Sequence, residues 1–341
     1  MFASGTLCYP PVNITKQYLV RKGEDMKILV IGMGNIGAIH GWLLSESGLD
    51  VTHVVRKGSL AKYAAGVRMD VLDLRGDTPK RYVTTYTPRI VDNINGKEDF
   101  ELVLVATNHY QAADAVRQYR DLIPTADFLM FTANWKGVAA YDALLPRERY
   151  LWGFAVSTGG RGTDGVLYAN IQKYYRIGEL DGSRTPRLEK IITMFGQAGL
   201  TPDLKANIIE WQWVHHAIDA GLIGTALAAG GLPAADAGKE VWLLMVRAVK
   251  DALAVLERRG VDVWSYPDTR LYAMPDEEKA AAKLHQMIVG LPHYERTRQH
   301  SHFDTSPKEM QRFYLDVVET GEELGVPMPY LGPLKSKILG D

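Results

Sequence analysis

The stretch MKILVIGMGNIGAIH, residues 26–40, determines the fold that we predict for this chain of 341 residues. Residues 27–31 form a short apolar, β-branched run, which is typical of a buried strand. Glycines follow at positions 32, 34 and 37, and apolar residues then recur at helical spacing. A strand, three glycines and a helix in this order indicate a βα unit that binds a dinucleotide.

Each glycine of this turn has its own physical reason. Gly32 allows a tight turn, Gly34 allows the backbone to approach a pyrophosphate, and Gly37 allows close packing of helix and strand. The amide groups at the helix start face the phosphate charge. We therefore predict that Gly32, Gly34, Asn35, Ile36 and Gly37 bind the cofactor. The alternative is a glycine turn in another kind of β-α unit.

The composition is that of an ordinary globular protein, with 46% hydrophobic and 23% charged residues. A net charge of −1 gives no sign of a nucleic-acid or anionic-membrane partner, and no apolar run is long enough to span a bilayer. The single cysteine, Cys8, excludes an internal disulfide and a cysteine-based metal cluster. We therefore expect a cytoplasmic protein that acts on a small molecule.

Residues 1–25 lack the charged start and long apolar middle of a secretory signal. We interpret them as a loosely structured extension, or as the product of an upstream start site. The predicted dinucleotide fold begins at residue 26.

The second predicted strand, residues 51–55, ends in Arg56 and Lys57. A site specific for NAD places an acidic residue near this point, where it holds the ribose 2′-hydroxyl. Here two cations suit a 2′-phosphate, and no neighbouring carboxylate in the sequence repels it. We therefore predict NADP(H) as the cofactor. The alternative is that the two cations only form a solvated turn.

Further buried strands at residues 101–106 and 128–131 alternate with helical patterns, which indicates a mainly parallel sheet. Ligands of such sheets bind beyond the carboxyl ends of the strands. We therefore predict that Asn108, Gln111 and Asn134 lie at the cofactor edge, although each is also compatible with a helix cap or loop. Residues 159–162 are predicted to form a glycine loop between late strands.

The pattern becomes helical after a linker-like segment at residues 181–186. Long helices are predicted at residues 208–229, 241–259 and 307–324, and no strand is expected. The predicted fold class is α/β: a Rossmann-type NADP-binding domain over residues 26–183 and an all-helical domain over residues 184–341. We expect the helical domain to bind substrate and to be able to support a homodimer.

The order of these motifs resembles the ketopantoate reductase (2-dehydropantoate 2-reductase) family from residue 26 to the C-terminus. The segments that carry the resemblance are KILVIGMGNIG, VVRKGSL, LVLVATNHYQ, FTANWKG, EWQWVHHAIDAGLIGTAL and SPKEMQRFYLDVVETGEELGVPMPYL. The resemblance implies a Rossmann domain followed by a helical domain, with NADPH as the cofactor.

The resemblance also implies roles for single residues. Arg56 corresponds to the residue that binds the 2′-phosphate, and Asn134 to one close to the nicotinamide and the substrate. Glu309 corresponds to an acidic residue that helps to hold the substrate in the catalytic site. Thr297 lies where a substrate-binding serine is expected.

Two departures from the family pattern change the chemistry of the site. His215 occupies the position of the family's proton-donating lysine, and Asp219 replaces an asparagine one helical turn later. Ketone reduction by hydride leaves an alkoxide, which needs a proton donor. Histidine exchanges protons near neutral pH, and a carboxylate four residues away lies on the same helical face. We predict that His215 is the acid/base and Asp219 its partner. The alternative is a hydrogen-bonded histidine without a catalytic role.

The sequence thus predicts an NADP(H)-dependent oxidoreductase that acts on a 2-keto acid such as 2-dehydropantoate, or on a different ketone. The second substrate class is included because Asp219 adds negative charge to a site where the family binds an acid. The main alternative is a non-catalytic NADP(H) sensor or partner-binding protein, and another is an opine- or imine-forming reductase. His293, His300, His302 and Asp304 suggest a metal site only by spacing, and we expect no metal.

Overall fold

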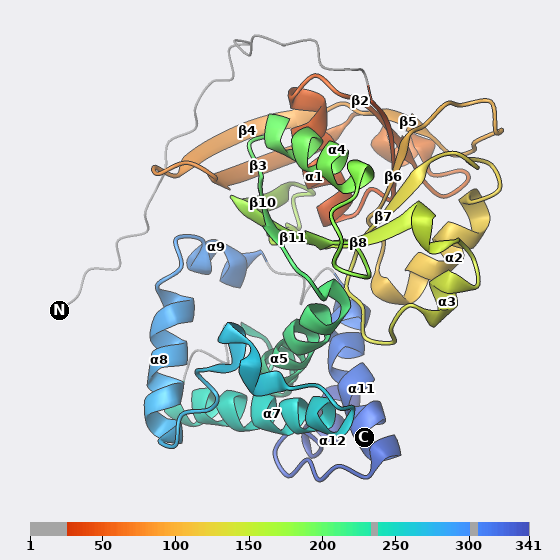
Figure 1. The fold of residues 1–341 in the computed structure, drawn as a ribbon. Coiled ribbons are helices and arrows are strands. Elements are labelled where there is room, and N and C mark those ends of the chain that lie inside the picture. Colours follow the sequence, from red (N-terminus) through yellow and green to blue (C-terminus); the bar gives the residue numbers. More distant parts are fainter. Residues whose placement is uncertain (1–25, 233–237, 301–305, 341) are drawn as a thin grey trace. The chain divides into compact units, whose positions relative to one another are not determined.

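The computed structural model describes residues 26–232, 238–300 and 306–340 (Figure 1). The extension predicted at residues 1–25, with Cys8, lies outside these ranges. The chain divides into two compact units, Met1–Ile208 and Ile209–Asp341. The first unit contains two β-sheets with helices, and the second is built from helices.

The main sheet of the first unit has eight strands in the order β12-β11-β8-β7-β6-β1-β2-β5. Its strands from β5 to β8 are all parallel, whereas β11 is antiparallel to β8. This parallel arrangement confirms the predicted α/β class. The bounds of the strands are β1 (Lys27–Ile31), β2 (Asp50–Val54), β5 (Arg89–Val91), β6 (Leu102–Val105), β7 (Asp127–Phe131), β8 (Tyr150–Phe154), β11 (Tyr174–Gly178) and β12 (Thr201–Leu204).

A second sheet of four strands, in the order β4-β3-β10-β9, was not predicted as a separate layer. Its strands are β3 (Val67–Leu74), β4 (Lys80–Tyr86), β9 (Thr158–Arg161) and β10 (Leu167–Gln172). The prediction of a glycine loop at residues 159–162 is wrong, because β9 pairs antiparallel with β10. The glycines permit this pairing: a Cβ at Gly159 would lie 2.4 Å from the carbonyl oxygen of Tyr168.

One hydrophobic core joins both sheets through the helices α1 (Asn35–Glu46) and α4 (Pro186–Gln197). Helix α1 contributes Ile39, Leu43 and Leu44 to this core, and it packs against β2, β9 and β10. The other helical segments of the unit are α2 (His109–Tyr119), α3 (Ala139–Asp142), η1 (Leu60–Tyr63) and η2 (Arg147–Arg149). The core therefore places the start of α1 between the main sheet and the second sheet.

The second unit is helical throughout the residues that the structure describes. Its central helix α7 (Lys239–Arg258) packs against α8 (Glu277–Val289) and α11 (Pro307–Leu324). The remaining segments are α5 (Ile208–Ala228), α9 (Tyr294–Gln299), α12 (Leu334–Leu339), η3 (Val263–Ser265) and η4 (Pro267–Thr269). The predicted long helices are confirmed to within a few residues.

The predicted domain boundary between residues 183 and 184 differs from the structure, which divides the chain after Ile208. Strand β12 pairs parallel with β11 at the edge of the main sheet, so α4 and β12 complete the first unit. The physical reason is a buried ion pair that crosses the expected linker. Arg187, in the first turn of α4, contacts Glu179 just after β11, and the two side chains are only 14% and 3% exposed.

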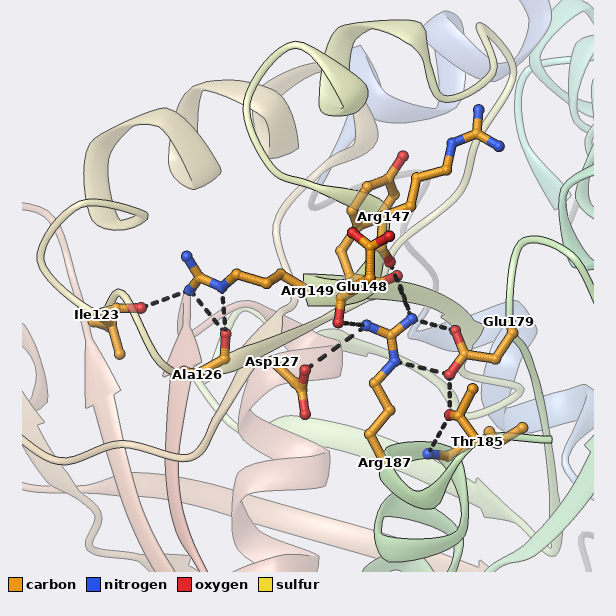
Figure 2. A network of polar contacts seen from close by, with 11 residues as sticks. Ile123, Ala126, Asp127, Arg147, Glu148, Arg149, Glu179, Thr185 and Arg187 are labelled. Atoms are coloured by element: carbon orange, nitrogen blue, oxygen red, sulfur yellow. Dashed lines mark hydrogen bonds and ion pairs between the residues drawn. The ribbon is translucent and has the colours of Figure 1, made fainter. Parts of the chain in front are cut away.

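Figure 2 shows how this ion pair ties α4 to the strands. Arg187 Nε donates to Glu179 Oε1 at 2.8 Å, and the same guanidinium donates to the carbonyl oxygens of Tyr150 at 3.0 Å and of Glu148. The hydroxyl of Thr185, the N-cap of α4, also donates to Glu179. The network therefore satisfies a buried carboxylate and a guanidinium with partners from three segments.

We expect Arg187→Ala to lower the free energy of unfolding by about 3–5 kcal/mol, because Glu179 would remain buried without its ion-pair partner. Arg117→Ala is the matched control, since its pair with Asp114 is exposed and is expected to contribute at most about 1 kcal/mol. Urea denaturation of both variants measures the difference. A loss at Arg187 no larger than the loss at Arg117 would contradict the role of the network.

Candidate functional site

The glycine turn has the geometry that its sequence predicts. Gly32 has a φ of +105°, and a Cβ there would lie 3.0 Å from the carbonyl oxygen of Ala106. A Cβ at Gly37 would lie 2.6 Å from the carbonyl oxygen of Gly32, so helix and turn approach each other closely. At Gly34 no atom lies within 4 Å of the corresponding Cβ position. The turn therefore leaves one open side, next to the start of α1, where a phosphate group can approach the backbone.

A buried histidine forms a hydrogen bond to the backbone of this turn. His53, in β2, is fully buried, and its Nδ1 donates to the carbonyl oxygen of Gly32 at 3.1 Å. On its other side, Nε2 accepts from the hydroxyl of Tyr86 in β4 at 3.0 Å. Burial lowers the pKa of His53 to about 4, so the ring is neutral at physiological pH.

Sequence reasoning did not include His53 among the site residues. Its signal was a single histidine inside the apolar strand sequence VTHVV. Gly41 in α1 provides the space for this ring, because a Cβ there would lie 2.1 Å from His53 Nε2. The partner Tyr86 is 33 positions away in the chain and belongs to the other sheet, so local patterns could not indicate it.

Arg56 and Lys57, which are predicted to meet a 2′-phosphate, are exposed beyond the end of β2. The expectation that no carboxylate lies nearby is wrong. Asp92, directly after β5, accepts a hydrogen bond from the backbone N–H of Gly58 at 2.9 Å. The parallel pairing of β5 with β2 brings this carboxylate to the loop.

Asn35 and Ile36, the first residues of α1, both bond within the first unit. The side-chain amide of Asn35 donates to the carbonyl oxygen of Gly159 in β9 at 3.0 Å. The carbonyl oxygen of Ile36 accepts from His40 Nδ1 at 2.9 Å. Asn35 therefore connects the start of α1 to the second sheet.

The residues predicted at the cofactor edge, Asn108, Gln111 and Asn134, follow β6 and β7. They lie at the same carboxyl edge of the main sheet as the glycine turn, because β1, β6 and β7 are parallel. The loops after these strands are joined by Thr132, whose hydroxyl donates to the carbonyl oxygen of Thr107 at 2.8 Å. Asn108 is half-buried at the N-cap of α2 and donates to the hydroxyl of Tyr110 at 2.8 Å. Gln111 is also half-buried and lies in the first turn of the same helix.

Asn134 is buried and stabilises its own turn. Its Oδ1 accepts from the backbone N–H of Gly137 at 2.7 Å, and its Nδ2 donates to the carbonyl oxygen of the same residue at 3.1 Å. This arrangement shapes the loop that follows β7. In this structure the amide of Asn134 therefore acts as a turn-forming group.

In the second unit, His215 and Asp219 lie one turn apart on α5, as predicted. His215 Nε2 is 3.4 Å from Asp219 Oδ2, and the two side chains are 33% and 27% exposed. The imidazole stacks on Trp211, with ring centroids 5.1 Å apart. Burial raises the pKa of Asp219, and the charge of His215 opposes this shift. The pair thus combines an accessible imidazole with a carboxylate whose charge is costly to bury.

The two other predicted residues of this unit lie on different helices. Thr297 is half-buried on α9, and Glu309 is half-buried in the first turn of α11. His216, next to His215, is buried and stacks on Phe313, with ring centroids 4.5 Å apart. Its Nε2 lies 3.7 Å from Oδ2 of Asp316. This contact makes His216 part of the packing between α5 and α11.

Residues 26–232, 238–300 and 306–340 contain neither a metal-binding cluster nor a membrane-spanning helix. No group of three or more His, Cys, Asp or Glu side chains there is arranged to hold a metal ion. Within the same ranges, no helix has the length and apolar character needed to cross a membrane. The metal site suggested by spacing includes His302 and Asp304, which lie outside the described residues.

The parallel sheet, the open glycine turn and the polar groups beyond the strand ends define a Rossmann-type fold, the kind of fold that binds nucleotides. Residues 28–182 match the family model described as ketopantoate reductase PanE/ApbA. This match, which covers less than half of the chain, agrees with the resemblance to the ketopantoate reductase family that the sequence indicates.

Curated relatives include the 2-dehydropantoate 2-reductase of Pyrococcus horikoshii, which is 24% identical over 198 residues, or 58% of this chain and 62% of that protein. The chain thus matches less than two thirds of the length of that relative. The 2-dehydropantoate 2-reductase of Archaeoglobus fulgidus is 22% identical over 88% of this chain and 92% of that protein.

Solved structures share the fold. The 2-dehydropantoate 2-reductase of Geobacter metallireducens has a TM-score of 0.67 and 19% identity, covering 92% of this chain and 99% of that chain. A ternary structure of D-mandelate dehydrogenase with NADH and anilino(oxo)acetate has a TM-score of 0.66 and 14% identity, covering 92% and 98%. These likenesses confirm the fold class.

The buried histidine makes the stability of the first unit depend on pH. The unfolded chain binds a proton at His53 below about pH 6.5, whereas folded His53 stays neutral down to a pKa of about 4. The free energy of unfolding should therefore fall as the pH drops from 6.5 to 4, by up to about 3 kcal/mol for this residue. His40, whose pKa burial also lowers to about 4, adds in the same direction.

Urea denaturation at several pH values compares the protein with His53→Gln, which cannot titrate. The variant is expected to show a shallower decrease between pH 6.5 and 4. Equal slopes would contradict a neutral, buried His53.

Proposed function

We propose that this protein is an NADP(H)-dependent oxidoreductase that transfers hydride between NADPH and a ketone. The substrate is a 2-keto acid such as 2-dehydropantoate or a different ketone. The observation that carries the proposal is the glycine turn at residues 32–37, whose Gly34 is open to an approaching phosphate. The family-model match over residues 28–182 supports the reaction class, and the 2-dehydropantoate 2-reductases among the relatives support the substrate class.

The charges around the adenosine end support NADPH as the preferred cofactor. Arg56 and Lys57 are exposed where a 2′-phosphate is expected. The nearby carboxylate of Asp92 accepts a hydrogen bond from the backbone of Gly58, which balances part of its charge. Since the D-mandelate dehydrogenase structure contains NADH, a comparison of both cofactors is an essential part of the test.

The proton needed for ketone reduction is assigned to His215. When bound, NADPH would supply the hydride that reduces the ketone, which would leave an alkoxide at the carbonyl oxygen. The imidazolium of His215 donates a proton to this oxygen. Asp219, 3.4 Å away, stabilises the imidazolium and orients the ring, while the stacked Trp211 limits its rotation. In the reverse direction the neutral imidazole removes the proton of the alcohol.

NADPH oxidation by the purified protein tests the proposed function, with ketopantoate and a panel of other 2-keto acids and ketones as substrates. We expect NADPH consumption with at least one of them, faster than with NADH. Turnover of ketopantoate supports the first substrate class, and turnover only of another ketone supports the second. NADPH binding without consumption across the panel would favour the non-catalytic sensor.

The role of His215 predicts a specific loss in His215→Ala. We expect kcat to fall by about 10²–10⁴, the contribution of a positioned proton donor, with the Kd for NADPH unchanged. His285→Ala, which removes an exposed histidine of α8, serves as the control and should retain full activity. Stopped-flow kinetics and cofactor titration measure the two quantities. Near-normal turnover in His215→Ala would show that the proton comes from another group.

A further inference from the structure

A guanidinium from the second sheet reaches the glycine turn. Arg161 is the last residue of β9 and is half-buried. One of its terminal nitrogens lies 3.5 Å from the carbonyl oxygen of Met33, the residue between Gly32 and Gly34. The side chain therefore approaches the turn that is proposed to bind the pyrophosphate.

The backbone around Arg161 is held in place from two directions. Strand β9 pairs with β10, with Arg161 opposite Leu167. Asn35, the first residue of α1, donates to the carbonyl oxygen of Gly159 in the same strand at 3.0 Å. The strand is thereby tied to the helix start, so the position of Arg161 relative to the turn is set by the fold.

The polar partners of Arg161 differ from those of the other partly buried arginines in this unit. Arg75, Arg81 and Arg187 each form an ion pair with a carboxylate. Arg149 donates to two carbonyl oxygens at 2.7 and 2.9 Å. Within the described part of the chain, the only hydrogen bond of the Arg161 side chain is the 3.5 Å contact with Met33, which is too long to be strong.

This environment leaves a partly buried positive charge that an anion would stabilise. Burial lowers the pKa of Arg161, which means that its charged form lacks full compensation. An arginine nevertheless keeps its charge, because its ordinary pKa is so high. Tyr63, at the end of η1, lies near enough to influence the same pKa. Arg161 thus contacts the glycine turn at Met33, and the Tyr63 ring is the nearby group that favours its charged form.

We propose that Arg161 binds the pyrophosphate of the dinucleotide, as a cationic residue supplied by the second sheet. A planar guanidinium matches phosphate oxygens with two parallel hydrogen bonds. The glycine turn offers only backbone N–H groups and a helix terminus, and Arg161 adds the positive charge that these groups lack. The inference rests on the proposed cofactor site and extends it with a specific anion-binding side chain.

The test compares Arg161→Gln with Arg56→Gln by fluorescence titration of the full chain. The four ligands are NADPH, NADH, ADP, which has a pyrophosphate, and 2′-AMP, which has only the 2′-phosphate. We expect Arg161→Gln to lower the affinity for NADPH, NADH and ADP by roughly 10- to 100-fold and to leave the affinity for 2′-AMP unchanged. Arg56→Gln should lower the affinity for NADPH and 2′-AMP and leave the affinity for NADH and ADP unchanged.

Several outcomes would overturn the proposal. Wild-type affinity of Arg161→Gln for ADP and NADH would exclude a pyrophosphate contact. A loss confined to NADPH and 2′-AMP would assign Arg161 to the 2′-phosphate instead. If the protein with Arg161 intact binds none of the four ligands, the cofactor site itself is refuted, whereas binding without turnover leaves this inference intact.

A second measurement separates ligand binding from a purely structural role. In the absence of nucleotide, Arg161→Gln should have a Tm equal to or above that of the unaltered protein, because a partly buried charge is removed. Arg161→Lys should bind ADP more tightly than Arg161→Gln but less tightly than the unaltered protein, since lysine keeps only the point charge. A lower Tm together with unchanged ADP binding would identify Arg161 as a structural residue.

Discussion

The first unit depends on a close approach of two backbone segments that only glycine permits. A Cβ at Gly37 would lie 2.6 Å from the carbonyl oxygen of Gly32, so any larger residue would push α1 away from the turn. Because α1 also packs against β2, β9 and β10, such a shift would disturb the core that joins both sheets. The close approach that shapes the glycine turn is therefore also one that the fold requires.

The second sheet contributes contacts that hold the glycine turn and the start of α1 in place. Tyr86 from β4 fixes the ring of His53, which in turn holds the carbonyl oxygen of Gly32. Strand β9 bonds to Asn35 at the start of α1 and brings Arg161 to the turn. A βα unit alone would offer backbone N–H groups, whereas the second layer adds rigidity and a positive charge.

The helical unit provides a different kind of chemistry, which arises from local spacing. The i, i+4 relation of His215 and Asp219 places imidazole and carboxylate 3.4 Å apart on α5. Because burial raises the pKa of Asp219, the pairing with His215 is the interaction that favours its charged form. The same contact therefore orients the imidazole and compensates the carboxylate.

Much of this protein could be predicted from its sequence, because the relevant signals are local. Spacing within a few residues predicts the glycine turn and the buried strands. Helical periodicity predicts the long helices and the pair of His215 with Asp219. Contacts between distant segments were decided only by the tertiary structure. Strand β12 is short and polar and is recognised as a strand only through its pairing with β11. Because of this pairing the first unit extends to Ile208, beyond the boundary predicted at residue 183. Likewise Asp92 and Arg161 reach the site through strand pairings that no local pattern encodes, because the partners of a strand depend on the whole fold.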